Sequence, residues 1–256
     1  MNIKIFKSDG TQNTFVIIYD NYNHNEIIKN IKFICNKFKT DGMLLISDIE
    51  NYDFKMDYFN NDGTWETMCA NGARCAGLLM WKIKKCNKNI TFLSGDGPHK
   101  LNIQNSNNIS LSFKTPKFKT DEIKLFNYQG RFVDSGAKHF AVLTNIVNEN
   151  IVKEYGPKIR NHKTFKPEGV NVNFFKIVDK NHIIVYTYEK GVESMVMSCG
   201  TGSVACAFYA HEQKLIKSPL KVTVPGGELN ISFDKNWDEV WLSGPSNISE
   251  SIEINI

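Results

Sequence analysis

The sequence has no long apolar run and no segment typical of export. Nothing in its 256 residues approaches the roughly 18 consecutive apolar positions of a membrane-spanning helix. The opening residues, MNIKIFKSDG, lack the apolar stretch of a secretory signal, so we expect a cytoplasmic protein with no membrane partner. The six cysteines are then expected to be free thiols, because disulfides persist mainly in oxidising compartments.

Common site motifs are also absent from the sequence. It has no Cys-x-x-Cys pair, no cluster of His, Asp and Glu with clear metal-ligand spacing, no Walker loop and no Gly-x-Gly-x-x-Gly. The formal charge of +4 comes from 31 basic and 27 acidic residues that are mixed along the chain, unlike a nucleic-acid-binding arm. We therefore expect no cofactor, no metal and no nucleic-acid partner.

The composition and the hydrophobic periodicity indicate a folded α+β protein. Apolar residues make up 41% of the chain and charged residues 23%. Apolar residues recur at helical spacing in three stretches, 24–38, 72–85 and 202–216. Alternating or short apolar runs predict strands elsewhere. These runs lie at 15–19, 44–47, 54–58, 109–113, 139–143, 170–178, 183–188 and 229–233.

The two later helical stretches have matching beginnings. Cys69 opens CANGARCAGLLMW and Cys199 opens CGTGSVACAFYA, so each cysteine precedes a small residue, Asn or Thr, Gly and a helix. The string GTQNTFVII from Gly10 also resembles GAKHFAVL from Gly136. These matches predict an internal duplication of roughly 120–130 residues. We expect two pseudo-symmetric α+β halves, each with strands wrapped around a central helix and the active site in the cleft between them.

The predicted division places Cys69 and Cys199 in different halves. The N-terminal half would cover residues 1–118 and the C-terminal half residues 119–256, with exchange of the C-terminal strand between halves left open. Each thiol would lie at a helix N-terminus, where unpaired N–H groups and the helix dipole stabilise a thiolate and bind a carboxylate. One thiolate could remove the α-proton of an amino acid while the opposite thiol returns a proton, which inverts the centre without a cofactor.

A cysteine at such a position can also be an ordinary small buried residue. The matched loops in matched halves favour function for Cys69 and Cys199. Cys75 and Cys206 lie on apolar helix faces and are expected in the core, whereas Cys35 and Cys86 carry no motif and are interpreted as structural.

The same residues resemble the diaminopimelate epimerase family nearly end to end. The string from Cys69 to Cys75, Cys-Ala-Asn-Gly-Ala-Arg-Cys, is the most specific match to the family signature. Other segments match the family's motifs in order. They are Gly10-Thr-Gln-Asn13-Thr-Phe, Thr40-Asp41-Gly42, Phe59-Asn60-Asn-Asp-Gly63, Gly169-Val-Asn171-Val-Asn-Phe, Tyr188-Glu189-Lys190-Gly191, Cys199-Gly200-Thr201-Gly202, Pro225-Gly-Gly-Glu-Leu and Trp241-Leu-Ser-Gly-Pro.

The resemblance implies a role for each matched residue. It implies that Cys69 and Cys199 interconvert LL- and meso-diaminopimelate, a precursor of lysine and peptidoglycan. His139 and Glu189 would assist catalysis. The backbone of Ala70, Asn71, Gly200 and Thr201 would hold the reacting carboxylate. The distal end of the substrate would be bound by Asn13, Asn60, Asn171, Glu189 and Lys190. A homodimer is left open as the assembly.

Several positions depart from the family's pattern, and they put the substrate in doubt rather than the reaction. Lys190 replaces the usual Arg, which exchanges a bidentate fork for a point charge. Ala137 and Lys138 replace the common Asn-Pro, so one amide expected at the distal carboxylate is missing. Ala70 stands for the usual Gly, and Met195 and Val196 for Glu-Thr. Two alternatives therefore stay open: a racemase of the same fold acting on another amino acid, such as lanthionine or histidine, and a non-catalytic amino-acid-binding protein.

Overall fold

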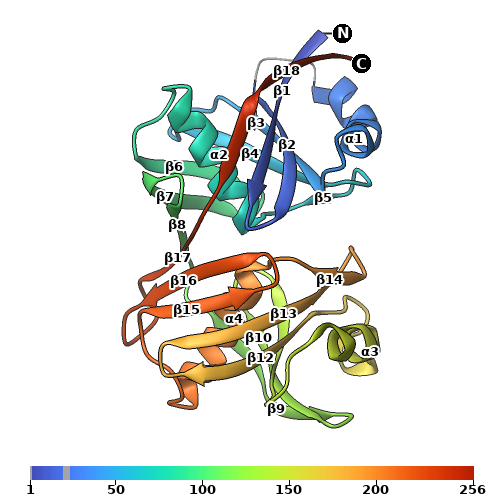
Figure 1. Cartoon of the computed structure of the whole chain (residues 1–256), viewed down its shortest axis with the longest axis vertical. Helices are drawn as coiled ribbons and strands as arrows, with labels where there is room; N and C mark the ends of the chain where they lie inside the picture. Colours follow the sequence, from blue (N-terminus) through green and yellow to red (C-terminus); the bar gives the residue numbers. More distant parts are fainter. Residues whose placement is uncertain (1, 20–23) are drawn as a thin grey trace. The chain divides into compact units, whose positions relative to one another are not determined.

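The chain divides into two compact units. A computed structural model describes residues 2–19 and 24–256. The first unit comprises residues 1–111 and 244–256, and the second comprises residues 112–243 (Figure 1). The expected division after residue 118 falls inside strand β9 (Lys117–Leu125), whereas the compact units divide between Leu111 and Ser112.

The first unit is a mixed sheet packed around helix α2 (Ala70–Lys82). Its strand pairs are antiparallel except β2 with β3 and β4 with β6, which are parallel. Helix α1 (His24–Phe38) packs against β2 and β3. The strands, in spatial order, are β18 (Asn247–Asn255), β1 (Asn2–Gly10), β2 (Asn13–Tyr19), β3 (Gly42–Ser47), β4 (Phe54–Asn60), β6 (Asn89–Ser94), β7 (Gly97–Asn105) and β8 (Asn108–Phe113), with β5 (Trp65–Glu66) paired to β4.

The second unit repeats this arrangement around helix α4 (Gly200–Glu212). Its parallel pairs are β11 with β12 and β13 with β15. Helix α3 (Glu149–Arg160) packs against β12 and β13, and a 3-10 turn, η1 (Lys163–Phe165), follows it. The strands, in spatial order, are β9, β10 (Tyr128–Asp134), β11 (Lys138–Leu143), β12 (Asn171–Asp179), β13 (His182–Glu189), β15 (Leu220–Val224), β16 (Gly227–Phe233) and β17 (Val240–Gly244), with β14 (Ser194–Val196) paired to β13.

The two units contain equivalent elements in the same order and orientation, which confirms the predicted α+β fold of two repeated halves. One strand differs in its origin. In the second unit β9 directly precedes β10 and pairs with it, whereas its equivalent beside β1 is β18, from the end of the chain. The C-terminal segment thus completes the sheet of the first unit.

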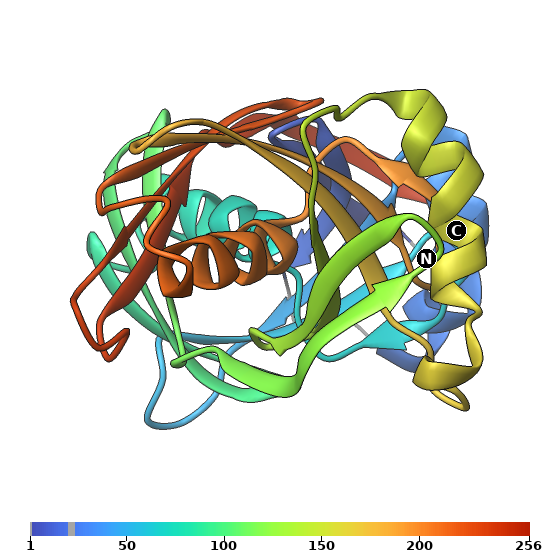
Figure 2. The ribbon, with the colours of Figure 1, turned by 90° about the horizontal axis from the view of Figure 1, so that it is seen from below.

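Both central helices are buried because small residues allow the strands to approach them closely. Every residue of α2 from Ala70 to Met80 is buried. A Cβ atom added to Gly77 would lie 2.6 Å from Leu101 of β7, so a larger residue would push that strand away. Figure 2 shows α2 in teal and α4 in orange, each flanked by strands of its own unit.

The strand register identifies which residues are equivalent in the two units. A Cβ atom on Gly72 would lie 2.9 Å from Leu44, and one on Gly202 would lie 2.1 Å from Asn173, so Leu44 and Asn173 occupy the same place under their helices. On the neighbouring strand of the first unit, β2, Ile17 is the partner of Leu44. On the neighbouring strand of the second unit, β11, Ala141 is the partner of Asn173. Two residues earlier on these strands, Phe15 is therefore the equivalent of His139.

This register corrects the alignment suggested by the two glycine strings. Matching Gly10 to Gly136 would pair Asn13 with His139, whereas the structure makes Asn13 equivalent to Ala137. The reason is that four residues separate the paired Asp9 and Thr14 in the first hairpin, but three separate Asp134 and Lys138 in the second.

The helix predictions agree with the structure apart from their ends and one omission. The stretch 24–38 is helical as predicted. Helices α2 and α4 begin directly after each cysteine, two residues before the predicted starts at 72 and 202. Helix α4 ends at Glu212, so Leu215, which is inside the predicted stretch 202–216, lies beyond the helix and is 37% exposed. Helix α3 was not predicted, because Gly156 and Pro157 interrupt its pattern; its Asn148 N-cap, which accepts from Ile151 N at 3.0 Å, was the available signal.

Candidate active site

Each central helix begins directly after a cysteine. Cys69 is the N-cap of α2 and Cys199 the N-cap of α4, both with extended backbone and neither with a side-chain cap bond. The Cys69 carbonyl accepts from Ala73 N at 2.8 Å, and the Cys199 carbonyl from Ser203 N at 3.0 Å. The N–H groups of the first turn have no carbonyl partner within the helix, and the helix dipole is positive there. Each unit therefore presents a thiol beside a polarised helix end that suits a carboxylate.

The Cys69 thiol faces the side chain of Asn13. Its Sγ donates to Asn13 Oδ1 at 3.7 Å, and Asn71 Nδ2 donates to the same oxygen at 3.2 Å. Asn13 Nδ2 donates in turn to Asp41 Oδ2 at 3.2 Å. Because a carboxylate accepts only, Asp41 fixes the orientation of the Asn13 amide. The structure thus brings Asn13 and Asn71, two residues expected to bind substrate, to the thiol expected to act on it.

Arg74 lies fully buried one turn into α2. Its Nη2 donates to Asn71 Oδ1 at 3.0 Å and to Thr11 Oγ1 at 2.9 Å, and its Nη1 donates to the Ala70 carbonyl at 3.4 Å. Burial lowers the pKa of the guanidinium, and attraction to the Cys75 and Cys69 sulfurs opposes that shift. A buried cation at this position favours negative charge on groups at the start of the helix, such as a Cys69 thiolate or a bound carboxylate. In the sequence, Arg74 was noted only as part of the string from Cys69 to Cys75. The signal for its role in the site was a charged residue within an otherwise apolar helical stretch.

The surroundings of the Cys199 thiol favour its protonated form. Its side chain is buried, and burial together with the negative charge of the hydrogen-bonded Glu189 raises its pKa well above the ordinary value. The Gly202 N–H acts in the opposite direction. The Thr201 hydroxyl lies 3.5 Å from Sγ. Glu189, expected to assist catalysis, thus lies beside the second thiol.

His139 contacts the neighbour of Cys199 rather than the thiol itself. Its Nε2 lies 2.9 Å from Thr201 Oγ1, and its Nδ1 lies 2.8 Å from Asn173 Oδ1. Burial lowers the pKa of the imidazole to about 4, so the ring is neutral near pH 7. His139, Thr201, Cys199 and Glu189 therefore form one cluster in the second unit. Asn173 belongs to that cluster but was not singled out in the sequence, where it stands as a polar residue within a buried apolar strand.

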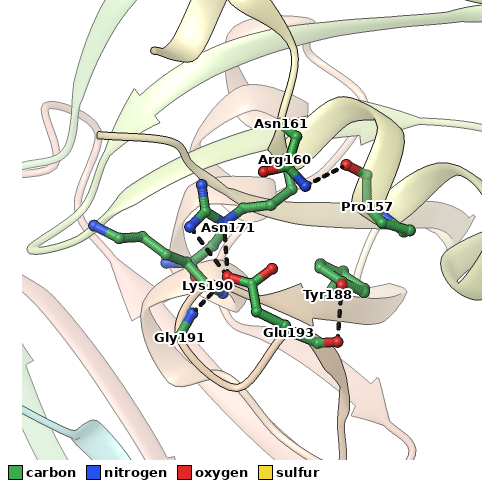
Figure 3. Close-up of polar contacts among 8 residues, drawn as sticks. All are labelled: Pro157, Arg160, Asn161, Asn171, Tyr188, Lys190, Gly191 and Glu193. Atoms are coloured by element: carbon green, nitrogen blue, oxygen red, sulfur yellow. Dashed lines mark hydrogen bonds and ion pairs between the residues drawn. The ribbon is translucent and has the colours of Figure 1, made fainter. Parts of the chain in front are cut away.

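The turn between β13 and β14 is fixed by polar contacts (Figure 3). Lys190 N donates to Asn171 Oδ1 at 2.8 Å. Arg160 of α3 donates from Nε and Nη2 to Glu193 Oε1 at 3.2 and 3.1 Å, and Gly191 N donates to the same oxygen at 3.1 Å. The Lys190 side chain extends away from this cluster in Figure 3. Asn171 and Lys190, both expected to bind the distal end of substrate, are thus adjacent through the backbone of Lys190.

The remaining expected residues lie at strand and helix ends. Ala70 and Gly200 are the first residues of α2 and α4. Asn60 ends β4, where its Oδ1 accepts from Tyr58 OH at 2.7 Å. Among the departures from the family's pattern, Lys138 forms an ion pair with Glu168. Met195 and Val196 lie on β14, paired with Tyr188 and Thr187 of β13.

Two further features concern membranes and metals. Over residues 2–19 and 24–256, no helix combines the length and apolar character needed to cross a membrane. Over the same residues, no three His, Cys, Asp or Glu side chains are grouped as metal ligands. All six cysteines carry free thiols, and Cys75 and Cys206 are in the core as predicted.

Comparison with known families matches both units. The family model described as diaminopimelate epimerase matches residues 5–118 and 131–248. Each matched segment contains one of the two N-cap cysteines, Cys69 or Cys199. This agrees with the internal duplication inferred from the sequence.

Proteins named diaminopimelate epimerase are similar to this chain along nearly its whole length. The protein from Aquifex aeolicus is 32% identical, with 94% of each chain covered. The protein from Chlorobaculum tepidum is 31% identical, covering 93% of this chain and 95% of its own length. That from Flavobacterium psychrophilum is 31% identical, covering 95% and 97%.

Solved structures share the fold at low sequence identity. A predicted epimerase from Pseudomonas aeruginosa superposes with a TM-score of 0.77 at 10% identity, covering 99% of both chains. A probable proline racemase from Agrobacterium radiobacter gives a TM-score of 0.76 at 12% identity, covering 99% of this chain and 93% of its own. The family match over both units and the full-length relatives lead to one conclusion: this chain belongs to the diaminopimelate epimerase family of isomerases.

Proposed function

We propose that this protein interconverts LL- and meso-diaminopimelate by a two-base reaction that needs no cofactor, with Cys69 and Cys199 as acid and base. Family membership and the names of the full-length relatives support the substrate. The observation that carries the mechanism is the repeated placement of a thiol as the N-cap of a buried central helix, once in each unit.

The reaction inverts a carbon atom, so it requires one sulfur on each side of that carbon. The proposal therefore requires both units to engage one substrate. Backbone N–H groups at Ala70, Asn71, Gly200 and Thr201 would bind the α-carboxylate. As the α-proton leaves, the carbanion charge spreads into this carboxylate, where the helix ends stabilise it.

The environments of the two thiols suggest which one starts as the acid. Cys199 is protonated at rest, because burial and Glu189 raise its pKa. We therefore assign Cys199 as the proton donor in the first half of the cycle and Cys69 as the base. Cys69 must first lose the proton that it donates to Asn13 Oδ1, and the buried Arg74 cation favours that loss. In the reverse direction Cys199 must lose its proton, and the hydrogen-bonded Glu189 carboxylate is the group placed to accept it.

The distal end of the substrate is assigned to Asn13, Asn60, Asn171, Glu189 and Lys190. Asn171 and Lys190 support this assignment by their backbone contact, and Glu189 directly precedes Lys190. A specific observation favours a second candidate, an amino-acid racemase of the same fold with another substrate. Lys190 offers a point charge where a guanidinium would grip a carboxylate with two bonds, and Ala137 offers no amide at the place equivalent to Asn13.

The test is α-hydrogen exchange in deuterated water. Purified protein would be incubated with LL-diaminopimelate, lanthionine or histidine, and deuterium at the α-carbon followed by mass spectrometry. We expect exchange on LL-diaminopimelate, lost in both Cys69→Ala and Cys199→Ala and kept in Cys86→Ala, whose thiol lies outside both clusters. Exchange on another amino acid alone would select the second candidate. Exchange on none would reject both and leave a non-catalytic binding protein. The cytoplasmic location and the homodimer stay predictions.

A further inference from the structure

One pair of buried positions differs in chemistry between the two units. In the first unit Phe15 and Leu44 fill the positions on β2 and β3 that face α2, and both side chains are fully buried. In the second unit the equivalent positions on β11 and β12 hold His139 and Asn173, which are also fully buried. An apolar pair in one unit is thus a hydrogen-bonded polar pair in the other.

Packing alone does not require an amide at position 173. Leu44 fills the same space against the glycine of its helix, and leucine and asparagine are similar in length. Burying a polar side chain in place of an apolar one costs stability unless its hydrogen bonds are made. The polar pair is therefore expected to serve the chemistry of the second unit rather than its folding.

The bonds of Asn173 define the state of the His139 ring. Asn173 Oδ1 lies 2.8 Å from His139 Nδ1, and Asn173 Nδ2 donates to Thr187 Oγ1 at 2.6 Å. An amide oxygen only accepts, so the neutral ring must carry its proton on Nδ1. The other nitrogen, Nε2, then has a lone pair and can only accept from the Thr201 hydroxyl, 2.9 Å away. With its proton directed at His139, the Thr201 oxygen is left to accept from the Cys199 thiol at 3.5 Å.

We propose that Asn173 is a positioning residue that holds His139 as the Nδ1–H tautomer and thereby directs a hydrogen-bonded chain from the Cys199 thiol through Thr201 to His139 Nε2. The chain supports the protonated form of Cys199. Its catalytic consequence rests on the function proposed above, whereas the tautomer itself does not. In the first unit Phe15 takes the place of the histidine and cannot accept a hydrogen bond. There Cys69 donates to Asn13, whose amide is oriented by Asp41.

The tautomer can be measured directly in the resting protein. In samples labelled with ¹⁵N-histidine, two-bond ¹⁵N–¹H spectra distinguish Nδ1–H from Nε2–H rings. We expect His139 as Nδ1–H in the wild type and a shift towards Nε2–H in Asn173→Leu, the residue that the first unit uses. His182 bonds Thr223 through Nε2 outside this network and serves as the internal reference.

A matched variant separates orientation from packing. Thr187→Val has nearly the same shape and removes the other partner of Asn173, but it leaves the bond to His139, so the tautomer should not change. Asn173→Asp keeps an accepting oxygen beside Nδ1, so His139 should keep its proton on Nδ1 in that variant. An Nε2–H ring in the wild type, or an unchanged ring in Asn173→Leu, would overturn the proposal.

The kinetic test adds a second readout. If the proposed epimerase activity is present, Asn173→Leu should slow α-hydrogen exchange by about 10- to 100-fold and alter its pH profile, while Thr187→Val should slow it much less. Equal slowing and parallel pH profiles for the two variants would indicate a merely structural role. If the wild type shows no exchange on any amino acid, the proposed function fails, but the tautomer measurement still decides the role of Asn173.

Discussion

Replacing Gly202 by alanine would place a methyl group where Asn173 now lies. The added Cβ would be 2.1 Å from Asn173 Nδ2, which is far inside van der Waals contact. Asn173 cannot yield without losing its bonds to His139 and Thr187. At the equivalent Gly72, the added Cβ would be 2.9 Å from Leu44 Cδ2, the free end of a flexible side chain. The two substitutions are chemically identical but meet different neighbours.

The balance of effects predicts a large loss of stability at Gly202 and little change at Gly72. Alanine favours a helix over glycine by about 1 kcal/mol at either site. At Gly202 this gain is outweighed by overpacking of about 1–3 kcal/mol and the loss of two hydrogen bonds worth about 1 kcal/mol each. We expect Gly202→Ala to destabilise the protein by about 2–4 kcal/mol. Gly72→Ala meets a milder clash of about 1 kcal/mol, which the helix gain offsets.

Urea unfolding followed by far-ultraviolet circular dichroism measures both free energies of unfolding. The histidine ¹⁵N spectra of Gly202→Ala would show in parallel whether the His139 tautomer has been released. A Gly202→Ala variant as stable as the wild type, or equal losses in the two variants, would refute the reasoning. The first result would mean that Asn173 can move away from the helix at no cost, and the second that its hydrogen bonds add nothing to the cost of the clash.

Three other predictions concern titration and the turn after β13. Burial lowers the pKa of His139 from 6.5 to about 4, so the folded protein binds this proton more weakly than the unfolded chain. Stability should therefore fall by up to about 3 kcal/mol as the pH drops from 6.5 towards 4, and a pH series of urea unfolding should show this loss abolished in His139→Phe. Burial and the charge of Glu189 both raise the pKa of Cys199, and Glu189→Gln removes that charge. Iodoacetamide labelling of the Cys199 thiol, followed by peptide mass spectrometry, should then begin at lower pH. An unchanged labelling profile would contradict this prediction. Arg160→Met should release the Glu193 carboxylate, so that the Gly191 amide hydrogen exchanges faster with solvent. The free energy of unfolding should fall by less than about 1 kcal/mol, because the ion pair is partly exposed. Unchanged hydrogen exchange would mean that the turn keeps its structure without Arg160.

Local patterns in the sequence predicted the parts of the site that depend on neighbours along the chain. Cys69 and Cys199 were identified because each precedes a small residue, a polar residue and a helix, a pattern readable within one segment. Glu189 and Lys190 followed from a contiguous motif. In contrast, Asn173 gave no local signal of its partner, because His139 lies 34 residues away and meets it only when β11 and β12 pair in parallel.

The sequence by itself determined the two thiols, the duplicated α+β plan and the central helices, because short-range periodicity and repeated strings encode them. Only the tertiary structure decided that the C-terminal strand β18 completes the first unit and that Phe15, not Asn13, is the equivalent of His139. It also decided that Arg74 is buried against the first turn of α2. These outcomes depend on strand register and on contacts between distant segments, where a turn shorter by one residue changes which side chains share a face.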